Sequence, residues 1–257
     1  MRLCFFLLTV LGFLAIAESE TLLVPSEYPD IAEAIDAAES GDTVLIACGV
    51  YPAHDLVVDS KQIVIRSATG QADCVTIDVE GYDSFLKGTS LTGNFRLEGL
   101  TFFNSHKEVL YFDGGAAEVR GCLFNDNGRG VIDNEGFTKV TRCTFWGTLG
   151  PCISAYGEGF PDVRRCIFWE NAGAIVYEHP FASVSIECSD IEGGWPGQDN
   201  IIADPLFCES SIGNFNLQMD SPCIAENNDC GELMGAFPAG CSISTKELDW
   251  GMIKRLY

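Results

Sequence analysis

Aromatic and arginine side chains recur at fixed places in the middle of this chain. Phe103, Trp146 and Trp169 each stand three residues after the first residue of a repeated segment. Arg142 and Arg165 each stand directly before such a first residue. Aromatic rings stack well on the apolar face of a sugar, and arginine pairs with carboxylate or sulfate groups. These five residues are therefore our candidate ligand-binding residues.

Alternatives to ligand binding stay open for both groups. The aromatic stripe could be covered by the Cys-rich tail or by the segment around Trp250, or it could be exposed without a ligand. The arginines could be satisfied by surface ion pairs, which the nearby acidic residues favour. The arginine column also contains Arg120 and Arg164, and the acids near it in the repeat are Glu98, Glu118, Asp162 and Glu187.

A further column is partly acidic. Its members are Asp113, Glu135, Gly157 with Glu158, and His179. Stacking places carboxylates about 5 Å apart on neighbouring coils and about 10 Å apart on alternate coils. Those separations are close to the ones that retaining and inverting glycosidases use. Solvated turn acids are far more common than catalytic pairs, so the catalytic residues remain unassigned.

A uronate lyase would need a positioned base beside the sugar carboxylate, often with calcium held by clustered aspartates. The expected strands carry no tight Asp cluster beside a Lys or Arg, and the three histidines lack the spacing of metal ligands. We therefore assign no metal and no cofactor, and expect calcium only if the chain is a lyase. The histidines are His54, His106 and His179, and the turn asparagines Asn104, Asn127 and Asn171 suit a hydrogen-bonded ladder.

All of these positions follow from a repeat of about 22 residues. Short apolar alternations broken by Gly, Asn and Asp fill each repeat, and this pattern predicts strands. A fixed period of this length indicates stacked units that share one core. The sequence therefore predicts an all-β parallel β-helix with three strands per coil. The first residues are Leu100, Cys122, Cys143, Cys166 and Cys188, and a second apolar register is Val109, Val131, Ile153 and Ile175.

Strand alternation predicts which side chains face the core. The first residue and the Phe two positions later point inward, and the residues one and three positions after the first point outward. Stacking then makes the leading cysteines a column of buried thiols, although their spacing would also permit a disulfide. Export would allow disulfides of open connectivity in the tail, whose cysteines are Cys208, Cys223, Cys230 and Cys241.

The ends of the chain depart from the repeat. Residues 1–17 have the layout of a secretory signal peptide. The β-helix domain is expected over residues 18–241, with a cap helix at about 29–39 and an irregular tail at about 204–241. Residues 242–257 reverse the acidic character of the chain, so we expect an export or surface-attachment signal, or a docked terminal helix.

Charge and hydropathy limit the partners. The chain has 37 acidic and 15 basic residues and a formal net charge of −22, which argues against nucleic acid. The same charge repels uronic-acid polymers unless calcium or a basic patch intervenes. No stretch outside the signal segment is long and apolar enough to span a membrane. We expect a secreted or cell-surface protein.

Two segments resemble a known group. Residues 24–28 (VPSEY), 31–35 (IAEAI), 41–44 (GDTV) and 49–51 (GVY) resemble the start of bacterial right-handed parallel β-helix proteins of the pectin-lyase-like superfamily. Residues 188–195 (CSDIEGGW), 203–207 (ADPLF) and 221–223 (SPC) are similar to the last coil and tail of that group. The resemblance covers roughly residues 21 to 241 and implies a single-stranded right-handed β-helix. It specifies chemistry poorly, because the superfamily includes lyases, hydrolases, epimerases and adhesins.

The sequence as a whole favours an exported β-helix protein that binds an extracellular polysaccharide or a cell-surface glycan, or acts in adhesion. An enzyme is not favoured, because none of the catalytic signatures of the resembled superfamily is intact. The competing hypothesis is a polysaccharide lyase or a glycoside hydrolase. Ligand identity, oligomeric state and disulfide pairing cannot be read from the sequence.

Overall fold

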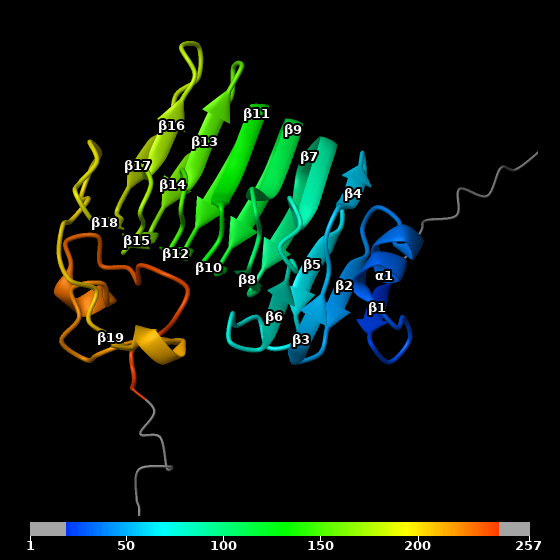
Figure 1. The fold of residues 1–257 in the computed structure, drawn as a ribbon, viewed down its shortest axis with the longest axis horizontal. Coiled ribbons are helices and arrows are strands. Elements are labelled where there is room, and N and C mark those ends of the chain that lie inside the picture. Colours follow the sequence, from blue (N-terminus) through cyan, green and yellow to red (C-terminus); the bar gives the residue numbers. More distant parts are fainter. Residues whose placement is uncertain (1–18, 242–257) are drawn as a thin grey trace, which may run out of the picture.

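The computed structural model describes residues 19–241, and the expected signal segment and the C-terminal segment 242–257 lie outside the described residues. The chain winds into a β-solenoid whose coils stack along one axis, with a separate tail against its lower side (Figure 1). Each coil contributes strands to three faces. The expected parallel β-helix is therefore confirmed, with pairing between strands of successive coils that is parallel throughout.

An eleven-stranded sheet forms two of the three faces. One face holds β4 (Leu56–Asp59), the first halves of β7 (Leu86–Glu98), β9 (Glu108–Arg120) and β11 (Arg129–Thr141), and then β13 (Ile153–Tyr156) and β16 (Val176–Glu178). The next face holds β1 (Thr21–Val24), β2 (Thr43–Ile46), β5 (Val64–Ser67), the second halves of β7, β9 and β11, and then β14 (Asp162–Arg164) and β17 (Ser185–Glu187).

The long strands turn the corner between these faces without a loop. In β9 the bend is made by Gly114 and Gly115, both with positive φ. A Cβ on Gly115 would collide with the backbone oxygen of Leu91 on the previous coil, so only glycine fits there. In β11 the bend includes Glu135, which has φ 59°. The three strands expected per coil are thus fused into two wherever this corner is tight.

A seven-stranded sheet forms the third face, in the order β18-β15-β12-β10-β8-β6-β3. Its strands are short because a turn follows each of them, and the central ones begin directly after the first residue of each repeat. The strands are β3 (Gly49–Pro52), β6 (Val75–Asp78), β8 (Thr101–Phe103), β10 (Leu123–Asn125), β12 (Thr144–Trp146), β15 (Ile167–Trp169) and β18 (Asp190–Ile191).

The predicted core columns are present along this sheet. Phe102, Phe124, Phe145 and Phe168 are fully buried, and successive rings lie 5.2, 4.4 and 4.8 Å apart between centroids. Cys122, Cys143 and Cys166 are buried free thiols, and each donates a weak hydrogen bond to the carbonyl two residues before it. Stacking like residues fills the core with rings in contact on every coil.

The thiol column ends one coil earlier than predicted. Ile167 pairs with Asp190, so Ser189 follows Cys166 in the column and Cys188 stands one position outside it. Cys188 instead has positive φ and forms a disulfide with Cys230 of the tail. The prediction that Cys188 is a buried column thiol is therefore wrong, because the turn before β18 shifts the cysteine out of the core by one residue.

Turn asparagines close the bends after this sheet. Asn127 accepts a hydrogen bond from Ser105 N (3.0 Å) and donates one to Phe102 O (2.9 Å). Asn171 makes the equivalent bonds with Thr148 N and Phe145 O. Asn127 and Asn171 thus satisfy backbone groups that a tight turn leaves unpaired, as predicted. Asn104 is not part of this ladder, because it donates instead to Asp78 Oδ1 (3.1 Å).

At the N-terminal end, α1 (Ile31–Ala37) packs against β1 and β2 (Figure 1). It is shorter than the expected 29–39. Asp30 caps it by accepting a hydrogen bond from Glu33 N (2.8 Å), and Ile31, Ala34 and Ile35 are buried. The described part of the chain contains no helix that is long and apolar enough to cross a membrane.

The tail lies against the outer side of the seven-stranded sheet. It contains an antiparallel pair, β19 (Phe207–Glu209) and β20 (Asn214–Leu217), and the short 3₁₀ helices η1 (Ser210–Ile212) and η2 (Ala225–Asn227). The disulfides Cys188–Cys230 and Cys208–Cys241 hold it, while Cys223 stays free and buried. Disulfides in the tail are thus confirmed, although one partner comes from the last coil. A third, Cys48–Cys74, links two N-terminal coils.

Candidate functional site

The tail covers part of the predicted aromatic stripe. Two apolar clusters join its residues to the outward side chains of the sheet. Leu123 on β10 and Ile167 on β15 point away from the solenoid core, as predicted, and both are buried by the tail. Two hydrogen bonds from backbone N–H groups of the tail anchor this contact: Ala236 N donates to the Thr144 side-chain Oγ1 (3.1 Å) and Gly235 N donates to Arg165 O (2.8 Å). Over β10, β12 and β15 the structure therefore has the covered stripe.

Trp146 and Trp169 lie side by side in register on β12 and β15, and both are half-buried. The Trp146 ring meets Phe215 of β20 edge to face, with centroids 5.7 Å apart. Its indole Nε1 is buried without a hydrogen-bond partner among the described residues. Trp169 packs in the cluster that contains Leu217 and Ile224. The two indoles thus support the tail, and no open two-ring platform is formed.

Phe103 lies at the open end of the same stripe and is 38% exposed. It lines a hollow of about 240 Å³ between β6, β8, β10 and the tail. We call this hollow the Phe103 pocket. Its lining residues are Asp73, Thr76, Thr101, Phe103, Leu123, Asn125, Gly213, Phe215 and Phe237.

Polar groups meet the aromatic rings in the Phe103 pocket. The Thr101 hydroxyl is committed, because it donates to Ala72 O (2.7 Å). The Asn125 side-chain oxygen, in contrast, accepts no hydrogen bond: Oδ1 is buried and has no partner among residues 19–241. Asp73 is exposed at the rim and Thr76 is half-buried. Three phenylalanines with an amide, a hydroxyl and a carboxylate form the mixture that sugar rings require.

The arginine column divides into paired and unpaired members. Arg164 pairs with Asp162 (2.8 Å) and Glu187 (3.0 Å), and Arg165 pairs with Glu232 of the tail (3.2 Å). The ion-pair alternative holds for these two. Arg142 has no ion pair within the described residues, and burial together with Arg120 and Arg165 lowers the pKa of its guanidinium.

The partly acidic column is not a column in the structure. Leu110 and Val176, rather than Val109 and Ile175, align with Val131 and Ile153. This shift by one residue pairs Asp113 with Asn134, so Asp113 and Glu135 are not equivalent positions. The predicted stacking of these two carboxylates is therefore wrong.

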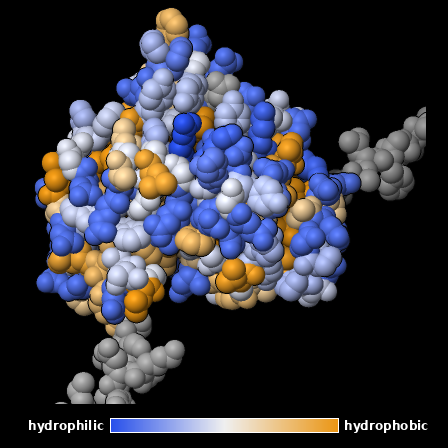
Figure 2. All heavy atoms as spheres, viewed as in Figure 1, coloured by the Kyte–Doolittle hydropathy of each residue, from blue (hydrophilic) through white to orange (hydrophobic). Residues whose placement is uncertain are grey.

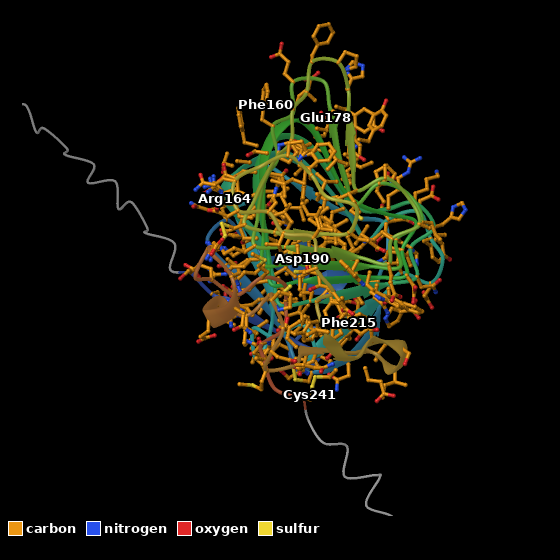
Figure 3. All side chains as sticks on the ribbon, turned by 90° about the vertical axis from the view of Figure 1, so that its left-hand side faces the viewer. Phe160, Arg164, Glu178, Asp190, Phe215 and Cys241 are labelled. Carbon is orange, nitrogen blue, oxygen red and sulfur yellow. A yellow bond between two sulfur atoms is a disulfide. The ribbon has the colours of Figure 1, made fainter. Side chains whose placement is uncertain are left out.

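Glu135 nevertheless lines the same hollow as another carboxylate. It lines an open hollow of about 460 Å³ with Glu158, Phe137 and Phe160, where the two rings lie 6.0 Å apart and nearly parallel. Figure 3, which looks along the solenoid, places Phe160 on the side opposite Phe215 and the tail. The sequence signal for this hollow was the repeated pattern Glu-Gly-Phe, at residues 135–137 and 158–160.

Two separate aromatic contacts on the first face were not predicted from the sequence. Lys87 Nζ lies 5.1 Å from the centre of the Tyr111 ring, and Tyr156 lies 5.2 Å from Tyr177 between centroids. Burial raises the pKa of Tyr111, and nearby acids, Asp113 first among them, raise it further. The one-residue register error affects the coils of Tyr111 and Tyr177, where Leu110 and Val176 take the places predicted for Val109 and Ile175.

One buried carboxyl lies where the tail meets the last coil. Asp190 is fully buried; Cys223 Sγ donates to its Oδ2 and Ala203 N donates to its Oδ1, both at 3.1 Å. Burial raises the pKa of Asp190 to about 6. Figure 3 shows Asp190 between the upper loops and the tail residue Phe215. Its two donors both come from residues that follow the last coil, so it fastens the tail.

One group of described residues has metal-ligand atoms close together: Cys188, Asp199 and Cys230. The two cysteines are bonded to each other, so their sulfurs are not thiolates that could hold a metal. Figure 2 shows hydrophobic residues in small separate patches among hydrophilic ones on the face drawn there.

Comparison with protein families agrees with this architecture. The family model for the right handed beta helix region matches residues 60–203, which is more than half of the 257-residue chain. The matched segment begins directly after β4 and ends twelve residues beyond β18, just before the tail. The protein therefore belongs to the right-handed β-helix family, and its resemblance to the pectin-lyase-like superfamily fits that membership.

Proposed function

We propose that this protein binds an extracellular polysaccharide or a cell-surface glycan, and that the Phe103 pocket holds one sugar residue of it. The observation that carries the proposal is the combination of an exposed Phe103 ring with the unused hydrogen-bonding capacity of Asn125. Fold alone is a weaker support, because β-helix proteins that act on polysaccharides include both binders and enzymes. Export is supported by the signal-like residues 1–17 and by three disulfides.

Three of the other candidate residues, Trp146, Trp169 and Arg165, act through the tail. Trp146 supports Phe215, which is one wall of the pocket. Trp169 packs beneath the same tail, and Arg165 fixes the tail by its pair with Glu232. Their role in this proposal is to position the wall. Phe103 and Asn125 make the direct contacts.

The pocket favours a neutral sugar over a uronate. Asp73 is the charged residue among its lining residues, and the chain as a whole carries −22. A uronate carboxylate in the pocket would meet like charge with no cation beside it. Neutral hydroxyls can instead donate to Asp73 and to Asn125.

A glycan array followed by calorimetric titration of the best neutral oligosaccharide tests the proposal. Phe103→Ala removes the ring and should weaken binding by about 1–2 kcal/mol, or roughly 5- to 30-fold in Kd. Asn125→Ala should weaken it to a similar extent. The matched control is Phe137→Ala, because Phe137 is 63% exposed and lies in the other hollow. Equal losses in both phenylalanine variants, or no binding by wild type, would refute the proposal.

A glycoside hydrolase is the second candidate, because Glu135 and Glu158 share one hollow with two aromatic rings. Paired carboxylates beside a sugar platform are what glycoside hydrolysis requires. A reducing-sugar assay over a polysaccharide panel, with and without calcium, separates the two candidates. We expect no activity. Activity that Glu135→Gln abolishes and Asp220→Asn leaves intact would make the protein an enzyme.

A further inference from the structure

A small hollow lies at the corner between the second face and the seven-stranded sheet, against the tail. It encloses about 90 Å³ and is lined by Gly70, Gln71, Glu98, Arg120, Gly121, Arg142 and Ala236. We call it the arginine pocket. It is separate from the Phe103 pocket, because the two pockets share no lining residue. Ala236 lines the arginine pocket and Phe237 lines the Phe103 pocket, and both residues belong to one apolar cluster with Ala72.

Arg142 is held in place but unsatisfied. Its backbone has φ 53°, and its N–H donates to Arg164 O on the next coil (3.0 Å). The side chain is half-buried, and its Nε atom is buried without a hydrogen-bond partner among residues 19–241. A buried guanidinium N–H without an acceptor is costly, since hydrogen bonds to charged groups are the strong ones. The Nε–H of Arg142 therefore has no acceptor among residues 19–241.

The charges around the pocket are unbalanced. Arg120 and Arg142 face it together with a single acid, Glu98, which leaves one net positive charge. Arg165 adds to the field on Arg142, but its own charge is already paired with Glu232. In a chain of net charge −22, a local excess of arginine is unusual and points to a bound anion.

We propose that the arginine pocket binds one singly charged oxyanion group, such as a sulfate ester or a carboxylate. At about 90 Å³ the arginine pocket has less than half the volume of the Phe103 pocket, about 240 Å³, which suits one small charged group better than a sugar ring. The planar guanidinium of Arg142 offers Nε–H and a terminal N–H to two oxygens of the same group. Arg120 supplies the second cation, and the net charge of the lining is then neutralised.

The group could be a free ion or an acidic substituent on a glycan, and the experiment has an arm for each. Wild type is titrated calorimetrically with methyl sulfate and with acetate, at constant ionic strength set by chloride. A sulfated disaccharide and its desulfated form are titrated in parallel. We expect saturable binding of methyl sulfate at one site. Tighter binding of the sulfated disaccharide would identify a glycan substituent, and binding of the small ions alone would identify a free ion.

Arg142→Gln should weaken methyl sulfate binding at least tenfold, and Arg120→Gln serves as a second variant if Arg142→Gln fails to fold. Arg164→Gln is the matched control, because it removes the same charge from an arginine that is already ion-paired. Absence of saturable binding, or equal weakening in Arg142→Gln and Arg164→Gln, would overturn the proposal. The small probes contain no sugar, so this result is independent of glycan binding in the Phe103 pocket.

Discussion

Replacing Asp190 by Asn should stabilise this protein at neutral pH and leave it unchanged in acid. The carboxyl lies under the tail, where Cys223 Sγ and Ala203 N donate to it. Burial raises its pKa from 3.8 to about 6. In the folded protein Asp190 therefore holds its proton over a range in which the unfolded chain has lost it.

The sign of the effect follows from that difference. A group whose pKa is raised on folding contributes its full stability below the unfolded pKa, near 4, and loses it as the pH rises through 6. A shift of about two pKa units corresponds to about 3 kcal/mol. Ionised Asp190 thus costs the folded state about 3 kcal/mol at pH 7.5 relative to the neutral acid. The amide that Asp190→Asn introduces stays neutral at every pH, and its oxygen can still accept from Ala203 N.

Urea unfolding at pH 4, 5, 6 and 7.5, followed by tryptophan fluorescence, measures this effect, since Trp146 and Trp169 pack against the tail. The expected gain of Asp190→Asn over wild type is close to zero at pH 4 and about 2–3 kcal/mol at pH 7.5. Asp220→Asn, which changes an exposed tail acid, controls for the overall negative charge. The reasoning fails if Asp190→Asn gains no more at pH 7.5 than at pH 4, or if Asp220→Asn reproduces its profile.

Three further predictions concern the frame of the site. Asn127→Ala leaves Ser105 N and Phe102 O without partners and should cost about 2–4 kcal/mol in urea unfolding, whereas the exposed Asn94→Ala should cost little. Cys230→Ser removes the disulfide to Cys188 and should lower the unfolding free energy by about 2–4 kcal/mol; an unchanged urea midpoint would contradict this. Burial raises the pKa of the Cys143 thiol well above its usual range, so a thiol reagent at pH 8 should label it only after unfolding, as peptide mass mapping can check.

The leading register could be predicted from the sequence because each repeat marks it twice. A small buried residue and a Phe two positions later point to the same side, and the three Phe pairs in contact confirm that phase. The position of Cys188 broke the pattern because a cysteine was as plausible in the core as Ser189. The geometry of the turn before β18 cannot be read from composition, and it places Ser189 rather than Cys188 in the core.

The second register failed for a similar physical reason. Val109 and Leu110 are adjacent, both apolar and both fully buried in the main core cluster. An alternation rule cannot distinguish two consecutive apolar residues. The resulting slip by one residue created an acidic column that does not exist.

The repeat could not predict that the tail covers the aromatic stripe. The tail has no periodicity, and its path over β10, β12 and β15 is set by a few long-range contacts, such as Ala236 N with Thr144 Oγ1. Outward apolar residues such as Leu123 and Ile167 were the signal that something covers them. They could not say whether the cover was a ligand or the chain itself.

A structure of the protein with the best neutral oligosaccharide from the array tests the central proposal most directly. The account predicts one sugar ring stacked on Phe103, with a hydroxyl within hydrogen-bonding distance of the Asn125 amide. Sugar density against Phe137 and Phe160 instead, beside Glu135 and Glu158, would contradict it.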